Sequence, residues 1–176
     1  MDTITHKTTW TIHKYRDQDG DIEKALRGGA SCEELSMRMP KAFIGKEIID
    51  SNVALNEGIG ELIDIIIGSG SPVKWDVTNA YLGVGNGTAP ADATDTGLSG
   101  ASKTYKAMDS GYPSKSSQTA VWRSTFGSSD ANYAWEEYTV VNASSDTGQN
   151  LNHKVESKGT KSSGETWTLQ LQITFS

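Results

Sequence analysis

The C-terminal run of residues 166–175 constrains the fold more than any other segment of the chain. Large apolar side chains occupy every second position, with threonine or glutamine between them; the apolar members are Trp167, Leu169, Leu171, Ile173 and Phe175. Strict two-residue alternation is typical of an antiparallel strand with one buried face and one solvated face. Because each fully buried side chain contributes roughly 1.5–3 kcal/mol, a register shift of one residue is strongly disfavoured.

Shorter segments of similar character precede this run from Val73 onward. We predict strands at about 79–84, 103–108, 119–126, 134–141 and 151–157, separated by segments rich in glycine, serine, asparagine and aspartate. Several short strands at this spacing indicate a sandwich or a barrel. No internal repeat is evident in the sequence, which argues against propellers and solenoids.

One helix is predicted upstream, at about 53–67, because apolar residues recur there at helical spacing with acidic residues between them. Gly58 and Gly60 each weaken such a helix by roughly 1 kcal/mol relative to alanine, so we expect them to allow close approach to a sheet. The expected fold class is therefore mainly β. We predict an antiparallel β-sandwich or jelly-roll-like domain over 51–176 that begins with one packed α-helix.

Residues 1–50 are expected to stand apart from this domain. Trp10 and Ile12 alternate with polar residues, which predicts a short strand over 8–15, and a similar alternation over 34–39 suggests a second strand. The region mixes short elements with charge and glycine, so it buries little apolar surface by itself. Two interpretations remain open: an N-terminal arm that gains order from a partner, or accessory strands added to the main sheet.

The composition narrows the possible partners. The chain has 176 residues, which suits one domain with an appendage or two very small domains. A formal net charge of −6 argues against a nucleic-acid partner, which would need a basic surface. Cys32 is the single cysteine, so we expect no internal disulfide. The sequence shows neither a bilayer-length apolar run nor a signal peptide, so we expect no membrane partner and synthesis in a host cytoplasm.

The spacing of potential metal ligands does not predict a metal site. The three histidines do not follow the spacing of a zinc site. Asp17, Asp19 and Asp21 alternate within a turn, but an EF-hand loop needs glycine at its sixth position and glutamate at its twelfth. This sequence has Ile22 and Gly28 there. We therefore predict no metal site and no bound cofactor.

The ionisable residues also do not predict a catalytic site. Glu136 and Glu137 are adjacent in a predicted strand, so their side chains point in opposite directions and cannot form a glycosidase pair. We expect one of them to point inward and to contact Arg123 or Lys154. His153 shares a predicted strand face with apolar residues, and we expect it to be packed and hydrogen-bonded. The protein is therefore predicted not to be an enzyme.

The stretch 78–100 begins as a short apolar strand and continues through alternating glycines at Gly83, Gly85 and Gly87. Such glycines let a backbone adopt positive φ and lie close to a neighbouring surface. Gly-x-Gly after a strand also occurs in phosphate-binding loops. Here the residues that follow are poor helix formers and lack a Lys-Ser/Thr pair, so we instead expect an ordered surface loop.

Four phrases of the sequence resemble small structural proteins of tailed bacteriophages. They are NAYLGVGNGTAPADATDTGL, KTYKAMDSGYPS, VWRSTFGSSDANYAWEEYTVVN and LNHKVESKGTKSSGETWTLQLQITFS, and the resemblance covers about residues 53–176. Members of this group are similar to capsid decoration (cement) proteins or to tail and fibre components. The resemblance implies a virion structural protein located on the capsid surface, which binds the major capsid protein and also itself, as a homotrimer.

The same resemblance gives the N-terminal residues an expected role. As an arm, they would place Trp10, Ile12 and Tyr15 against a neighbouring subunit, because aromatic anchors dominate interface energies. Two other functions stay open: a tail, baseplate or fibre component, and a carbohydrate- or receptor-binding module on the virion. The second needs exposed aromatic side chains, whereas the strand patterns around the tryptophans favour burial.

Overall fold

The computed structural model describes residues 5–176. Within this range the chain is mainly β, as predicted, with two five-stranded antiparallel sheets of the β-sandwich class and three short helices. Two compact units contain one sheet each. Unit 1 comprises Met1–Ser51, Met108–Asp130 and Ser162–Ser176, and unit 2 comprises Asn52–Ala107 and Ala131–Lys161. Two later segments of the chain thus belong to the same unit as the N-terminal region.

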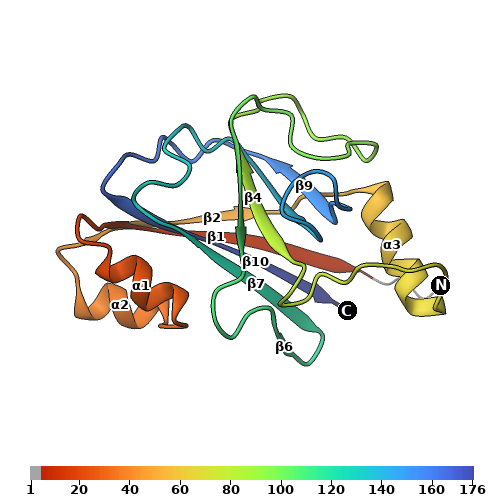
Figure 1. Cartoon of the computed structure of the whole chain (residues 1–176), viewed down its shortest axis with the longest axis horizontal. Coiled ribbons are helices and arrows are strands. Elements are labelled where there is room, and N and C mark those ends of the chain that lie inside the picture. Colours follow the sequence, from red (N-terminus) through yellow and green to blue (C-terminus); the bar gives the residue numbers. More distant parts are fainter. Residues whose placement is uncertain (1–4) are drawn as a thin grey trace. The chain divides into compact units, whose positions relative to one another are not determined.

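The sheet of unit 1 has the strand order β2-β1-β10-β7-β6 (Figure 1). Its strands are β1 (His6–Arg16), β2 (Phe43–Asp50), β6 (Ser114–Ser116), β7 (Thr119–Phe126) and β10 (Glu165–Phe175). The predicted buried face of the last strand is confirmed, since Trp167, Leu169, Leu171 and Ile173 are buried, but the other face is solvated only in part, because Thr168 is buried as well. Phe175 departs from the pattern and is 46% exposed, at the end of the strand.

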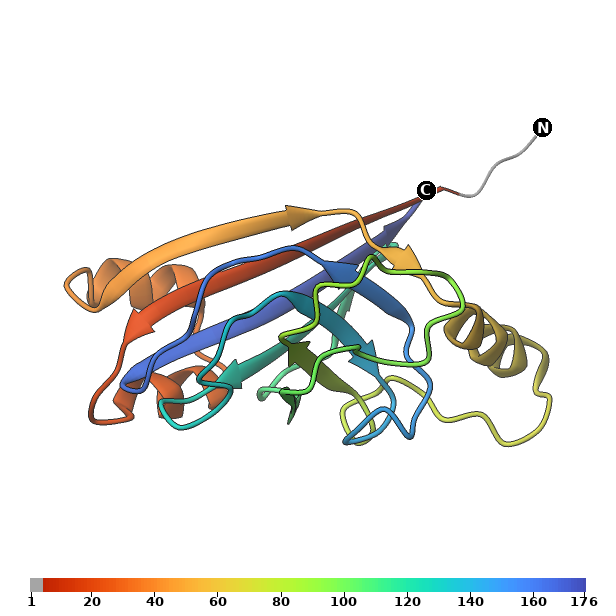
Figure 2. The same ribbon diagram turned by 90° about the horizontal axis from the view of Figure 1, so that it is seen from above.

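The prediction of a projecting arm is wrong for the described residues. β1 is hydrogen-bonded to β10 on one side and to β2 on the other, and the three strands run side by side in Figure 2. Trp10, Ile12 and Tyr15 are each 0% exposed, because they belong to the core of unit 1. The alternative of added strands is therefore correct, and β1 lies inside the sheet. Residues 1–4 of the predicted arm lie outside the described residues.

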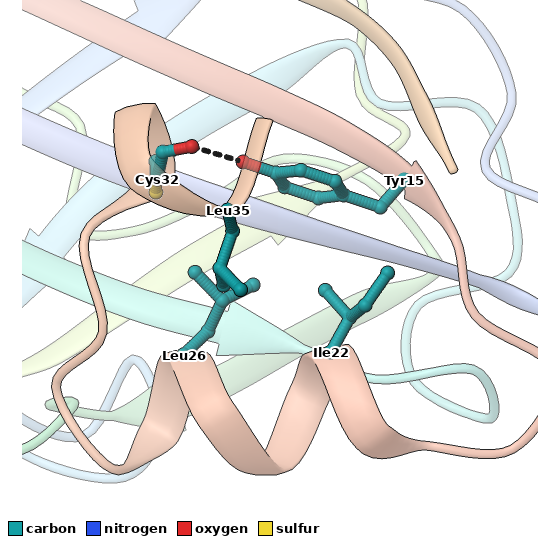
Figure 3. Close-up of a cluster of buried hydrophobic side chains, with 5 residues drawn as sticks. All are labelled: Tyr15, Ile22, Leu26, Cys32 and Leu35. Carbon is teal, nitrogen blue, oxygen red and sulfur yellow. Dashed lines mark hydrogen bonds between the residues drawn. The ribbon is translucent and has the colours of Figure 1, made fainter. Parts of the chain in front are cut away.

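Two short helices, α1 (Asp21–Arg27) and α2 (Cys32–Arg38), pack on unit 1 through an apolar cluster. Figure 3 shows this cluster, which consists of Tyr15, Ile22, Leu26, Cys32 and Leu35. The Tyr15 hydroxyl donates a hydrogen bond to the Cys32 carbonyl at 2.9 Å. The predicted strand over 34–39 is wrong, because Ser31 caps a helix there and only Cys32 and Leu35 are buried.

A buried ion pair connects these helices to the sheet. Arg123 on β7 and Asp109 are each about 2% exposed in their side chains, and Arg123 Nε donates to Asp109 at 2.8 Å. The guanidinium also donates to the carbonyls of Leu26, at the end of α1, and Ala30, in the linker to α2. The Arg123 side chain therefore satisfies carbonyl groups of the helical segment while it remains paired with Asp109.

Unit 2 contains the second sheet, with strand order β3-β9-β8-β4-β5. Its elements are β3 (Val53–Ala54), α3 (Asn56–Ile67), β4 (Tyr81–Gly85), β5 (Lys103–Ala107), β8 (Glu137–Val141) and β9 (Asn152–Val155). Each strand predicted in this part of the sequence is present, with its ends shifted by a few residues. None of the helices within residues 5–176 has the length and apolar character needed to span a membrane.

Helix α3 confirms the predicted helix and the reason for one of its glycines. A side chain at Gly58 would lie 2.5 Å from Leu151 Cα and 2.6 Å from the Asn150 carbonyl oxygen, so the helix backbone touches the segment that leads into β9. At Gly60 nothing lies within 4 Å. Close approach therefore explains Gly58 but not Gly60.

Candidate functional site

The buried carboxylate of Glu137 organises the long loop of unit 2. Glu137 is the first residue of β8 and is 0% exposed. Its oxygens accept hydrogen bonds from the backbone N–H groups of Gly87 (3.0 Å), Ser99 (2.8 Å) and Gly100 (2.7 Å), and from the Ser99 hydroxyl (3.0 Å). A side chain on Gly87 would collide with Ser99, which explains the glycine. The carboxylate therefore holds both ends of the loop over 86–100 on the sheet.

His153 extends this network from β9. Its Nε2 lies 3.1 Å from Glu137 Oε2, and its Nδ1 lies 2.8 Å from Oδ2 of Asp95, which belongs to the loop. The histidine side chain is 2% exposed and that of Asp95 is 31% exposed. An imidazole that contacts a carboxylate at each nitrogen matches both partners when it is the doubly protonated cation. The loop is thus tied to two strands through one ion network.

The pKa values follow from this geometry. Burial by itself raises the pKa of Glu137, but hydrogen bonds from His153, Ser99 and Gly100 outweigh burial and lower that pKa to about 2. Burial by itself lowers the pKa of His153, but its bonds to Glu137 and Asp95 reverse this and raise its pKa above 6.5. Both shifts favour the charged pair at neutral pH.

This arrangement stabilises structure and does not activate a nucleophile. Both ring nitrogens of His153 contact carboxylates, and the Ser99 hydroxyl donates to Glu137 and not to the histidine. A serine nucleophile would need the histidine as its proton acceptor. Within residues 5–176, no group of three or more His, Cys, Asp or Glu side chains is placed to hold a metal ion.

A polar cavity of about 450 Å³ lies beside the loop, lined by 94–99 together with Lys103 and Asp146. Lys103 Nζ lies 2.8 Å from the Asp146 carboxylate, and Tyr105 donates its hydroxyl hydrogen to the same carboxylate. The charged side chains that line the cavity are therefore already paired within unit 2. These pairs brace the loop, as the Glu137 network does.

Helix α3 shows an unusual orientation of its polar and apolar faces. Glu57 accepts hydrogen bonds from the Asn150 backbone N–H (2.6 Å) and side-chain amide (3.1 Å), and Glu61 accepts from the Val73 N–H and the Asn142 side chain. The acids thus face the rest of unit 2. The exposed apolar face, called the α3 isoleucine face below, consists of Ile59 (43% exposed), Ile63 (50%), Ile66 (79%) and Ile67 (68%).

The structure tests several sequence predictions about sites. His153 is packed and hydrogen-bonded, as expected, and one of the two adjacent glutamates points inward. The predicted contacts of that glutamate are wrong: Glu137 binds loop amides and His153, whereas Arg123 pairs with Asp109. The alternating glycines of the stretch 78–100 correctly indicated an ordered loop. The sequence did not indicate which carboxylate binds that loop.

The tryptophans give no support to a sugar-stacking surface. Trp10 and Trp135 are 0% exposed, and Trp75, Trp122 and Trp167 are exposed by 8% or less. Stacking on a sugar needs an accessible ring face, so the tryptophan platform of the carbohydrate-binding alternative is contradicted. Comparisons of the chain with protein-family models, curated proteins and solved structures return no match.

Proposed function

We propose that this chain is a structural protein of a tailed-phage virion that binds the outer surface of the capsid and stabilises it. The sequence phrases described above support the class of protein. Under this proposal the protein works by binding and not by chemistry, because a subunit that binds only the assembled shell stabilises it by mass action. Its binding partner is the major capsid protein.

The α3 isoleucine face is the observation that carries the proposal. Four isoleucines at positions 59, 63, 66 and 67 lie on one side of the helix and are 43–79% exposed. Contiguous exposed apolar side chains mark protein-interaction surfaces more often than chance. The inward hydrogen bonds of Glu57 and Glu61 fix this orientation, so the helix cannot bury the isoleucines by rotating without breaking them. The geometry therefore offers a rigid apolar surface to another protein.

Shell binding of the purified protein tests the proposal. The experiment mixes the full chain with capsids that lack it, separates the shells by sedimentation and measures the bound fraction. We expect saturable binding and a higher shell melting temperature. Ile66→Asp is expected to raise the dissociation constant for the shell about tenfold or more, because the loss of one well-buried apolar contact is worth roughly 1.5–3 kcal/mol.

The matched control is Ala89→Asp, which adds the same charge at an exposed loop position of unit 2. It is expected to bind like the wild type. Imaging of the subunit in intact particles separates the remaining alternative. Density on tail, baseplate or fibre and none on the shell would overturn the capsid assignment. Shell binding that Ile66→Asp leaves unchanged would overturn the role of the α3 isoleucine face.

A further inference from the structure

Strand β2 forms one edge of the sheet in unit 1 and has a strand neighbour, β1, on one side (Figure 2). The Ser51 N–H donates to the Thr8 carbonyl of β1 at 3.1 Å. Backbone groups alternate in direction along an antiparallel strand, so Gly45, Glu47 and Ile49 also direct their N–H and C=O groups toward β1. Of the even-numbered residues 44, 46, 48 and 50, the last three therefore direct theirs outward, away from the sheet, whereas Ile44 lies at a β-bulge in the pairing with β1.

The side chains of the same even-numbered residues form one exposed face of the edge. Ile44 is 40% exposed and Ile48 is 55% exposed, and Lys46 and Asp50 are exposed as well. Lys46 lies 3.9 Å from Glu33, and Asp50 accepts a hydrogen bond from Thr9 at 3.4 Å. An edge strand that combines outward backbone groups with exposed isoleucines is a template for pairing with another strand.

The order of side chains along this face limits what can pair with it. A two-fold axis perpendicular to the sheet pairs two copies of β2 antiparallel and keeps the same face of each strand on the same side. Even-numbered residues of one copy then lie opposite even-numbered residues of the other. A register centred on Lys46 places lysine opposite lysine, and one centred on Asp50 places aspartate opposite aspartate. Like charges directly opposite each other are destabilising.

The register centred on Ile48 has the opposite property. It places Ile48 against Ile48 of the second copy, and it places Lys46 opposite Asp50 at both ends of the paired segment. Cross-strand pairs of opposite charge and of β-branched apolar residues both stabilise antiparallel sheets. The same register aligns the outward backbone groups of these residues for hydrogen bonding, so charge pattern and backbone direction agree.

We propose that β2 pairs antiparallel with β2 of a second copy of this chain, with Ile48 opposite Ile48 and Lys46 opposite Asp50. The unit 1 sheets of the two copies then become one continuous sheet. The β2 edge is closed by an isologous two-fold contact. This contact uses unit 1 alone and does not depend on the proposed virion role. A three-fold assembly would have to use a different surface.

Charge exchange at the edge tests the proposal. The full chain is examined by sedimentation velocity over a range of protein concentrations, and we expect a monomer–dimer equilibrium. Lys46→Asp places aspartate opposite aspartate, and Asp50→Lys places lysine opposite lysine. Each single variant should weaken self-association about tenfold or more, because two attractive pairs become repulsive. The K46D/D50K double variant restores both pairs and should dimerise like the wild type.

A mixing experiment gives the sharpest result. When K46D is mixed with D50K, each position 46 faces an opposite charge at position 50 of the other chain, so the two weak self-associators should form a heterodimer. Lys115→Asp, at an exposed position of the opposite edge strand β6, is the matched control and should dimerise normally. Unchanged circular dichroism establishes that each variant is folded.

Three outcomes would overturn the proposal. They are a monomer at every concentration, a dimer that K46D and D50K leave unchanged, and a failure of the two single variants to associate with each other when mixed. A dimer that the single variants leave unchanged would have to use another surface. A monomer that binds a strand of capsid protein at β2 would identify a different occupant of the edge.

Discussion

The helices of the two units turn opposite faces inward: apolar in unit 1 and acidic in unit 2. In unit 1, α1 and α2 turn apolar residues such as Ile22 and Leu35 inward, where they join the cluster around Tyr15. In unit 2, α3 turns Glu57 and Glu61 inward to hydrogen bonds and leaves its isoleucines exposed. The comparison shows that a helix of ordinary amphipathic sequence can be fixed by its acidic side. This second arrangement leaves the apolar face of the helix exposed to a partner.

The two units also differ in their buried charged groups. Arg123 in unit 1 combines an ion pair to Asp109 with contacts to carbonyl groups of the helical segment. The network of unit 2 depends on the titratable pair of Glu137 and His153. We therefore expect loss of the buried ion pair to weaken unit 1, and protonation or deprotonation of the Glu137–His153 network to weaken unit 2.

Removal of the carboxylate from the Arg123 pair is expected to have the largest effect. Asp109→Ala leaves a buried guanidinium without its counter-ion, which typically costs about 3–5 kcal/mol of unfolding free energy. Chemical denaturation measures this loss, and hydrogen exchange should show it in α1 and α2. Asp19→Ala, at an exposed position of the same unit, is the control and should cost less than about 1 kcal/mol. Equal effects of the two variants would contradict the comparison.

Adjacent glutamates provide an internal control for unit 2. Glu137→Gln removes the charge that four loop donors and His153 contact, and we expect a loss of about 1.5–3 kcal/mol, the range for hydrogen bonds to charged groups. Glu136 accepts one bond from the Ser157 hydroxyl at an exposed site, so Glu136→Gln should change stability by less than about 0.5 kcal/mol. Hydrogen exchange at Ser99 and Gly100 distinguishes local opening of the loop from global unfolding.

The two helical glycines test how α3 is attached. Gly58→Ala forces the helix away from Leu151 and should destabilise unit 2 by about 1–3 kcal/mol, the usual cost of overpacking. Gly60→Ala meets no neighbouring atom and should stabilise the helix by roughly 1 kcal/mol. Thermal unfolding of both variants measures the difference in sign. If Gly58→Ala also stabilises the protein, backbone contact does not hold α3.

Stability is also expected to depend on pH, because two buried groups of unit 2 have shifted pKa values. The pKa of Glu137 is lowered from its ordinary value of 4.5 to about 2, so its contribution is present above pH 4.5 and is lost as the pH falls toward 2. The pKa of His153 is raised from 6.5, so its contribution is complete below pH 6.5 and is lost as the pH rises through the raised value. Unit 2 should therefore be most stable between about pH 4.5 and 6.5.

His13 of unit 1 has the opposite sign. Burial lowers its pKa below 6.5, and Lys46 and Arg123 add to this against the opposing effect of Glu33. Its contribution is therefore complete above pH 6.5 and is lost as the pH falls through the lowered value. Melting temperatures on both sides of pH 6.5 check the contrast. His153→Gln should flatten the alkaline decline and His13→Gln the acidic one; the reverse pattern would refute it.

Local sequence patterns correctly predicted those strands and helices whose formation depends mainly on their own residues. The alternation of Leu169 and Leu171 was sufficient for β10, because burial on one face fixes a strand from local information alone. The alternation of Leu35, Met37 and Met39 was misleading, since the methionines are exposed and the helix buries Leu35 with Cys32. Ser31 followed by Glu34 matches a helix-capping pattern and was the signal that could have corrected this prediction.

Contacts between distant segments could not be predicted from one sequence. The placement of β1 inside the sheet depends on pairing between His6 and Phe175, which are separated by almost the whole chain. The Glu137 network likewise joins a strand to amides in a loop that precedes it by about 40 residues. The alternation of Gly85 and Gly87 indicated a close approach, but only the tertiary structure identifies the carboxylate that they approach.

The position of β1 between β2 and β10 has a consequence for biosynthesis. Because β10 is the last strand of the sheet in sequence order, ribosomal synthesis releases β1 and β2 long before the strand that closes the other side of β1. The nascent chain therefore carries β1 without its second strand neighbour while the intervening segments are made. Unit 1 completes its hydrogen bonding only after translation reaches residues 165–175. Translation speed and chaperone access during that interval should govern the yield of native protein.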